Sequence, residues 1–109
     1  MGLVSFLAGR RRQPDSADLA IQIAALSREV ASELTVRRAK EMTLGEARGY
    51  IRARSRPTVV RQAELVFRRQ VPLAPSRQDE IVSLALDQIV YLVMRDLVHT
   101  SKGSRRRVA

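Results

Sequence analysis

The sequence predicts an all-α protein, a compact bundle of about four helices. Apolar residues recur at spacings of three and four, which is the helical period, and no stretch alternates in the manner of a strand. Ser, Thr, Gly and Pro separate the periodic segments. With 109 residues, the chain is long enough for a single domain, and its 45% hydrophobic content with only 4% aromatic residues predicts an aliphatic core.

The first helix is expected over residues 16–41. Asp15 or Ser16 can cap its N-terminus. The i,i+4 series Glu33, Arg37 and Glu41 indicates that the helix continues to residue 41. One face carries large apolar residues at spacings of four and three, and we expect this face to be buried: Leu19, Ile23, Leu26, Val30 and Leu34.

A second helix is expected over residues 44–55. Thr43 and Glu46 have the spacing of a capping box, in which each side chain accepts a hydrogen bond from the other residue's backbone N–H. Gly45, Gly49 and Ala53 fall on one line of this helix. The line indicates either the close approach of a neighbouring helix or local flexibility.

Pro57 predicts a break, because proline disfavours the helical conformation in the residue before it. A third helix is therefore expected over residues 58–70. The two prolines of the segment 72–75 then predict a turn.

The fourth helix is expected over residues 77–99, with Ser76 as its cap. Apolar residues cover most of its circumference, so it lies either at the centre of the bundle or at a homo-oligomer interface. Its narrow polar stripe places Asp87 in solvent. A buried Asp87 would instead need an arginine partner such as Arg48 or Arg52. The residues expected at an oligomer interface are Ile81, Leu86, Ile89, Val90, Val93 and Leu97.

Charge divides the chain into three parts: a basic N-terminal arm (1–14), a helical domain (15–100) and a basic C-terminal tail (101–109). The net charge of the whole chain is +9, and all but two of its 20 cationic side chains are arginines. Within the domain, residues 48–70 carry seven arginines and one glutamate, whereas residues 15–47 are slightly acidic. The positive charge is therefore concentrated in the middle and at both ends.

This pattern predicts contact with a polyanion, foremost the backbone of a nucleic acid, without strong sequence specificity. The guanidinium group can bind phosphate through two parallel hydrogen bonds, and the chain contains no base-reading motif. We expect the arginines in the middle of the chain to gather on one side of the molecule. The predicted contact residues are Arg10, Arg11, Arg12, Arg48, Arg52, Arg54, Arg56, Arg61, Arg68, Arg69, Lys102, Arg105, Arg106 and Arg107.

Three alternatives stay open. The basic surface can meet an acidic protein partner in a structural or assembly subunit, or the chain can self-assemble through its apolar last helix. Residues 1–12, a short apolar segment followed by arginines, can contact an anionic membrane surface. A small helical enzyme that stabilises charge with arginines is compatible with the size of the chain.

The composition argues against most other chemistry. The chain has no cysteine and one histidine, which excludes thiolate catalysis and the usual zinc sites. His99 has no recognisable catalytic partner and is expected to cap the last helix or face solvent. We therefore predict no enzyme activity, no metal and no cofactor.

The sequence predicts neither export nor a membrane-spanning helix. The apolar residues at the N-terminus precede the arginines, which is the reverse of a secretory signal. Charged residues interrupt the apolar stretch 81–98, so a membrane-spanning helix is not expected there. These features predict a cytoplasmic protein.

Overall fold

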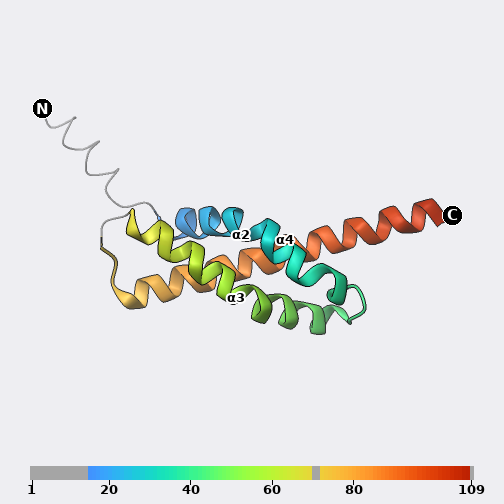
Figure 1. Ribbon diagram of the computed structural model, residues 1–109, viewed down its shortest axis with the longest axis horizontal. Helices are drawn as coiled ribbons and strands as arrows, with labels where there is room; N and C mark the ends of the chain where they lie inside the picture. Colours follow the sequence, from blue (N-terminus) through green and yellow to red (C-terminus); the bar gives the residue numbers. More distant parts are fainter. Residues whose placement is uncertain (1–14, 70–71, 109) are drawn as a thin grey trace, which may run out of the picture.

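Three α-helices make up the part of the chain that the computed structural model describes, residues 15–69 and 72–108, with side chains up to residue 99. They are α2 (Ser16–Ala39), α3 (Leu44–Arg68) and α4 (Pro75–Val108) (Figure 1). The all-α class is confirmed. The expected number of four helices is wrong, because the second and third form a single helix.

Helix α2 begins after Asp15, which occupies the N-cap position without a side-chain hydrogen bond to the backbone. It ends at Ala39, two residues before the expected end. The Glu41 and Met42 backbone N–H groups then donate to the carbonyls of Arg38 and Ala39 in a tight turn. This short turn joins α2 to α3, so the two helices form a hairpin.

The predicted capping box at the start of α3 is confirmed. The Glu46 backbone N–H donates to the Thr43 hydroxyl (3.2 Å), and the Thr43 backbone N–H donates to the Glu46 carboxylate (3.0 Å). The hydrogen bond from the Thr43 backbone, and with it the Thr43 side chain, lowers the pKa of Glu46. The helix therefore has a defined beginning at Leu44.

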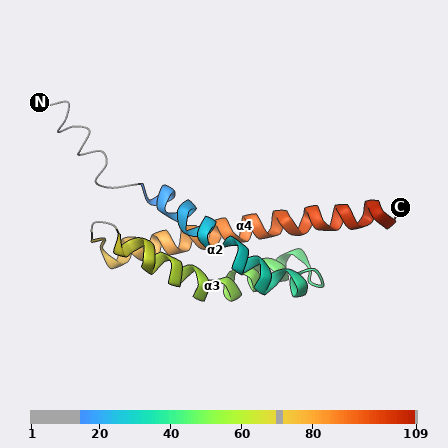
Figure 2. The same ribbon diagram turned by 45° about the horizontal axis from the view of Figure 1, so that its top comes forward.

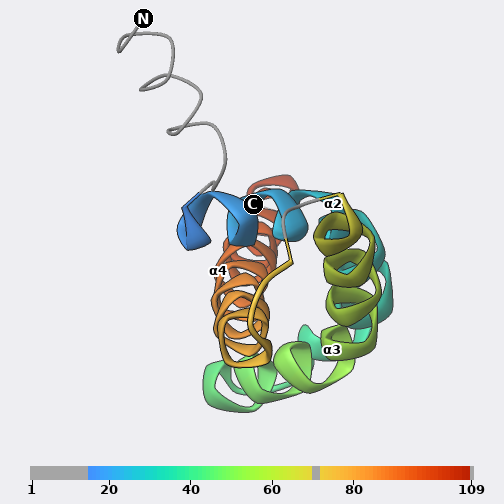
Figure 3. The same ribbon diagram turned by 90° about the vertical axis from the view of Figure 1, so that its left-hand side faces the viewer.

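Helix α3 continues through Pro57, which corrects the expected break between residues 55 and 58. Proline removes the hydrogen bond to the carbonyl of residue 53, but Ala53 and Pro57 are both exposed, so water can hydrate that carbonyl. On the opposite side, Ile51, Ser55 and Val59 are fully buried without interruption. Packing on this face outweighs the local preference, and the helix changes direction along its length (Figure 3).

Helix α4 begins at Pro75 rather than at residue 77. Proline is favoured in the first turn, where its missing N–H has no helical partner to lose. Ser76 therefore lies inside the helix and not at the cap, and the Gln78 backbone N–H donates to the Ala74 carbonyl (3.0 Å). The helix runs to Val108, and its last turns extend beyond α2 and α3 (Figure 2).

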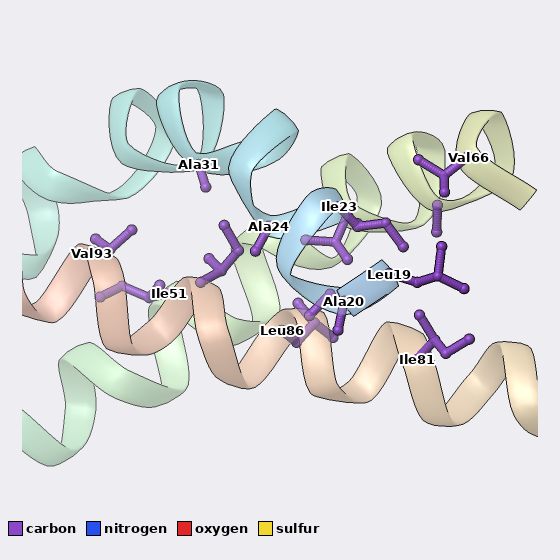
Figure 4. Close-up of a cluster of buried hydrophobic side chains, with 14 of the residues drawn as sticks. Leu19, Ala20, Ile23, Ala24, Ala31, Ile51, Val66, Ile81, Leu86 and Val93 are labelled. Carbon is purple, nitrogen blue, oxygen red and sulfur yellow. The ribbon is translucent and has the colours of Figure 1, made fainter. Parts of the chain in front are cut away.

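The residues expected at an oligomer interface lie instead in the core of one chain. Ile81, Leu86, Ile89 and Val93 are completely buried, Leu97 is 8% exposed, and Val90 is half-buried. Each helix contacts the other two, and α4 supplies three of the five largest aliphatic side chains that are completely buried among the described residues, Ile81, Leu86 and Ile89 (Figure 4). This burial favours the central position of the last helix, the other alternative from the sequence, because these side chains leave little surface for a second chain.

The expected buried face of α2 is only partly right. Leu19 and Ile23 are buried, but Leu26, Val30 and Leu34 are 52%, 44% and 38% exposed. The interior is lined instead by small residues at spacings of three and four: Ala20, Ala24, Ser27, Ala31, Thr35 and Ala39. Rows of residues four apart pack at steep crossing angles, and small side chains let helices cross closely.

Gly45 and Gly49 of α3 are exposed, and their surroundings test whether a neighbouring helix approaches α3 closely there. Apart from the backbone of α3 itself and the residues next in the chain, no atom lies within 4 Å of where a Cβ would stand at either position. Close approach of a neighbouring helix therefore does not explain them.

Candidate polyanion-binding surface

The arginines of α3 form two rows on different sides of the helix. The flank row consists of Arg48, Arg52 and Arg56, spaced by four residues, and the outer row of Arg54, Arg61 and Arg68, spaced by seven. Residues two apart on a helix differ by about 200° in direction, so Arg52 and Arg54 project to nearly opposite sides. The sequence predicts that these side chains gather on one side of the molecule. The structure instead places them on two sides of α3.

The flank row faces α4 and meets its acidic residues. Arg52 forms an ion pair with Asp87, and its second terminal nitrogen donates to the Ser83 hydroxyl (3.3 Å). The Asp87 side chain is 63% exposed, so the acid faces solvent and also has an arginine partner. Arg56 lines a depression of about 270 Å³ together with Asp79. Carboxylates of α4 thus offset part of the charge of the flank row.

The outer row is exposed along its whole length. None of its three guanidinium groups has an ion pair with a side chain among residues 15–69 and 72–99. A rise of about 1.5 Å per residue separates its members by roughly 10 Å along the helix. Arg69, the C-cap residue, is exposed beside the last member, and Glu64 is the acidic residue on this side of α3.

Arg54, the first residue of the outer row, also lines a basic depression between α2 and α3. This depression has a volume of about 680 Å³ and is lined by Glu33, Leu34, Arg37, Arg38, Tyr50 and Arg54. The Tyr50 hydroxyl donates to the Leu34 carbonyl (3.4 Å), a contact between the two helices of the hairpin. Three guanidinium groups from two helices therefore surround one hollow.

Sequence reasoning missed Arg37 and Arg38. They belong to a segment with a negative net charge, and averaging over that segment conceals them. A helical projection of α2 alone would show two adjacent arginines near its C-terminus. Only the hairpin brings these arginines next to Arg54.

The predicted terminal contacts cannot be placed on this surface. Arg10, Arg11 and Arg12 lie outside the described residues. Lys102, Arg105, Arg106 and Arg107 belong to the last turns of α4, whose side chains are not described.

A second ion pair lies on the other side of α2. The Arg28 guanidinium donates to both carboxylate oxygens of Asp96 (2.8 and 3.1 Å), which joins α2 to α4. Arg28 and Asp96 also line a depression of about 550 Å³ with Glu29 and Glu33. This mixed charge, with two acids beside the ion pair, makes the hollow a poor site for an anion.

The rest of the described chain offers little other chemistry. His99 is exposed at the side of α4. Within residues 15–69 and 72–108, no group of acidic and histidine side chains could hold a metal ion. The same part of the chain contains no helix that combines the length and the hydropathy needed to cross a bilayer.

Comparison with protein-family models, with curated proteins and with solved structures finds no match to this chain. A function can therefore be inferred only from the residues and geometry described above.

Proposed function

We propose that this protein binds a polyanion, foremost the phosphate backbone of a nucleic acid, through the outer row and the basic depression. The supporting observation is that Arg54 belongs to both features, so that exposed arginines continue from the end of α2 along the outer side of α3. The net charge of +9 adds a long-range attraction for any polyanion. The flank row is left out, because acidic residues of α4 lie beside it.

The binding mode that follows is contact with phosphates and little discrimination between sequences. Arginine forks bind phosphate oxygens in pairs, but such contacts carry no base information. Tyr50 is the aromatic residue of the basic depression, which limits stacking on the bases of a single strand. Affinity should therefore fall steeply with added salt, as bound counterions are released.

An acidic protein partner is the second candidate, and one observation favours it. Leu34 lines the basic depression and belongs to the exposed apolar row of α2, together with Leu26 and Val30. A phosphate chain gains nothing from such a row, whereas an acidic protein with apolar residues would bury it. The two candidates predict different ligands at the same depression.

The test compares two triple variants of α3 that lose the same number of charges. One replaces the outer row (Arg54→Gln, Arg61→Gln, Arg68→Gln), and the other replaces the flank row (Arg48→Gln, Arg52→Gln, Arg56→Gln). Binding of a labelled generic duplex and single strand is titrated at several salt concentrations. Each lost phosphate contact lowers the slope of log K against log salt by about 0.9 on duplex, so the outer variant should lose about 2 to 3 units and the flank variant less than 1.

Equal slopes for the two variants would contradict the assignment of the contact to the outer row. Oligonucleotide affinity that is absent at low salt, or does not change with salt, would remove the proposal itself. Circular dichroism of both variants shows whether each retains its helix content. In the same assay, Leu26→Gln should leave oligonucleotide affinity unchanged, because Leu26 belongs to the exposed apolar row of α2 but does not line the basic depression.

A further inference from the structure

An apolar groove lies between the start of α3 and the middle of α4, on the flank-row side of α3. Its volume is about 540 Å³, and its apolar lining consists of Leu44, Val90, Tyr91, Met94 and Val98. Leu44, Tyr91 and Val98 are 64%, 58% and 44% exposed, and the first two values are the highest for large apolar residues in the described part of the chain. The bundle thus leaves apolar side chains from two helices uncovered in one place.

Cationic side chains border this groove. Arg48 comes from α3 and Arg95 from α4, and both are exposed. The Arg95 guanidinium lies 6.0 Å from the centroid of the Tyr91 ring, within the range of a cation–π contact. Asp87 is the one acidic residue of the lining, and its carboxylate already bonds Arg52. An apolar floor with a positive border is complementary to a ligand that is both apolar and acidic.

We propose that this groove docks an acidic amphipathic helix of a partner protein. The residues that α4 contributes span positions 87–99, which is about 18 Å of helix, or three turns. A partner helix of similar length would place apolar side chains at i, i+3 or i+4, and i+7 in the groove. Its carboxylates would then reach the guanidinium groups of Arg48 and Arg95. This surface is separate from the outer row, so the inference does not depend on the proposed function.

Other occupants fit the groove less well. An acyl chain would stay largely in water, because Leu44 and Tyr91 are more than half exposed and the walls do not enclose it. A nucleic acid strand would find one aromatic ring and an aliphatic surface that bases do not use. A second copy of this chain would bring a net charge of +9 to a border that is already positive.

The experiment uses the full-length protein and two labelled peptides of about 16 residues, a length that covers four helical turns. The first carries Leu at one helical face and Glu elsewhere, and the second has the same composition in a scrambled order. Fluorescence anisotropy should show saturable binding of the amphipathic peptide. The scrambled peptide should bind about tenfold more weakly or less, since it cannot present one continuous apolar face.

Two valines provide a matched pair of variants, because Val98 and Val30 are each 44% exposed. Val98→Asp puts a carboxylate into the groove, whereas Val30→Asp puts one on the apolar row of α2. Val98→Asp should weaken binding of the amphipathic peptide roughly tenfold or more, through lost apolar contact and charge repulsion, and Val30→Asp less than about twofold. Both sites are exposed, so neither change should unfold the chain.

A second pair of variants separates this groove from the polyanion surface. Arg48→Gln with Arg95→Gln should weaken peptide binding and leave the salt dependence of oligonucleotide binding nearly unchanged. Arg61→Gln with Arg68→Gln should reduce the salt dependence of oligonucleotide binding and leave peptide affinity nearly unchanged. Each pair removes two positive charges, so net charge alone cannot produce this difference.

Three outcomes would overturn the proposal. Equal affinity for the scrambled and amphipathic peptides would show attraction by charge alone. A stronger effect of Val30→Asp than of Val98→Asp would place the peptide on α2. Displacement of the peptide by an oligonucleotide, with both ligands weakened by Val98→Asp, would assign the groove to nucleic acid.

Discussion

Three hydroxyl side chains are completely buried among residues 15–69 and 72–99, and they differ in whether the hydroxyl has a hydrogen-bond partner. Ser27 and Thr35 each donate to the carbonyl four residues earlier in α2, at 2.8 Å. Ser55, in the centre of α3, is buried to the same extent, but its hydroxyl has no hydrogen-bond partner among the described residues. A buried polar atom without a partner destabilises the folded state, whereas a bonded one costs little.

Ser55→Ala is therefore expected to stabilise the protein, by about 1 kcal/mol, because the unsatisfied hydroxyl costs about 1–3 kcal/mol and the methyl group retains most of the volume. Ser27→Ala is the matched control and should cost between zero and about 1 kcal/mol, since it removes a satisfied hydrogen bond. Urea unfolding followed by circular dichroism measures both. A loss of stability in Ser55→Ala equal to that in Ser27→Ala would mean that the Ser55 hydroxyl is bonded.

At the scale of the helix, Pro57 shows how far packing overrides local preference. Proline in a helix interior costs about 3 kcal/mol relative to alanine, and on this ground the sequence predicts a break. The structure keeps the helix intact because the buried residues before and after Pro57, Ile51 and Val59 among them, belong to the same hydrophobic core. The ring itself is exposed and displaces nothing in the core.

Pro57→Ala should consequently raise the free energy of unfolding, by about 1–3 kcal/mol, because it restores an N–H donor to the carbonyl of residue 53 without altering the core. Thermal unfolding gives the change. Thr58→Ala, next to it on the same helix, is a control with an expected effect below about 0.7 kcal/mol, the usual range of helix propensity. A lower melting temperature in Pro57→Ala would contradict this expectation and indicate that proline favours the shape that α3 adopts in the bundle.

At the scale of the whole molecule, positive charge is the dominant long-range property. A net charge of +9 on 109 residues makes the folded state repel itself. Two ion pairs, Arg28–Asp96 and Arg52–Asp87, join helices within the described residues, and both have side chains exposed by a third or more. Such pairs contribute little to stability, so they do not offset the repulsion.

Tm should for this reason rise when salt is added, from about 0.01 M to about 0.1 M NaCl, as the Debye length falls from about 30 Å to about 10 Å. The expected rise is a few degrees, since about 1 kcal/mol shifts the Tm of a domain of this size by roughly 4–8 °C. The triple variant of the outer row provides the comparison and should show a smaller rise. A Tm that falls with salt would mean that the ion pairs outweigh the repulsion.

The residue pattern predicts much of the local structure. The Thr43 capping box marks the start of α3, and the apolar spacing predicts helical structure in all three segments, although it divides α3 into two helices. The residue pattern gave wrong predictions where the outcome depends on how one helix packs against another. It could not show that Pro57 would be held within a helix, or that α2 would bury alanines and leave Leu26 and Leu34 exposed, because both depend on packing against other helices.

The candidate surfaces follow the same division. Exposure of the α3 arginines is expected from their charge, and the helical period already separates Arg52 from Arg54. The alignment of Arg61 and Arg68 with Arg54, however, follows from the unbroken helix through Pro57. Arg37 and Arg38 join Arg54 only because the hairpin folds α2 onto α3. The apolar groove with Tyr91 and Val98 has no signal in the sequence, because its walls come from segments about 40 residues apart.

The sequence by itself determined that this chain is helical, aliphatic in its core and strongly basic, because helix period, residue volume and formal charge are local properties that add along the chain. The tertiary structure decided which arginines are offset by acids, which apolar residues stay exposed and where the grooves lie. These are properties of pairs of helices, and they are set by which side chains can fit between crossing backbones.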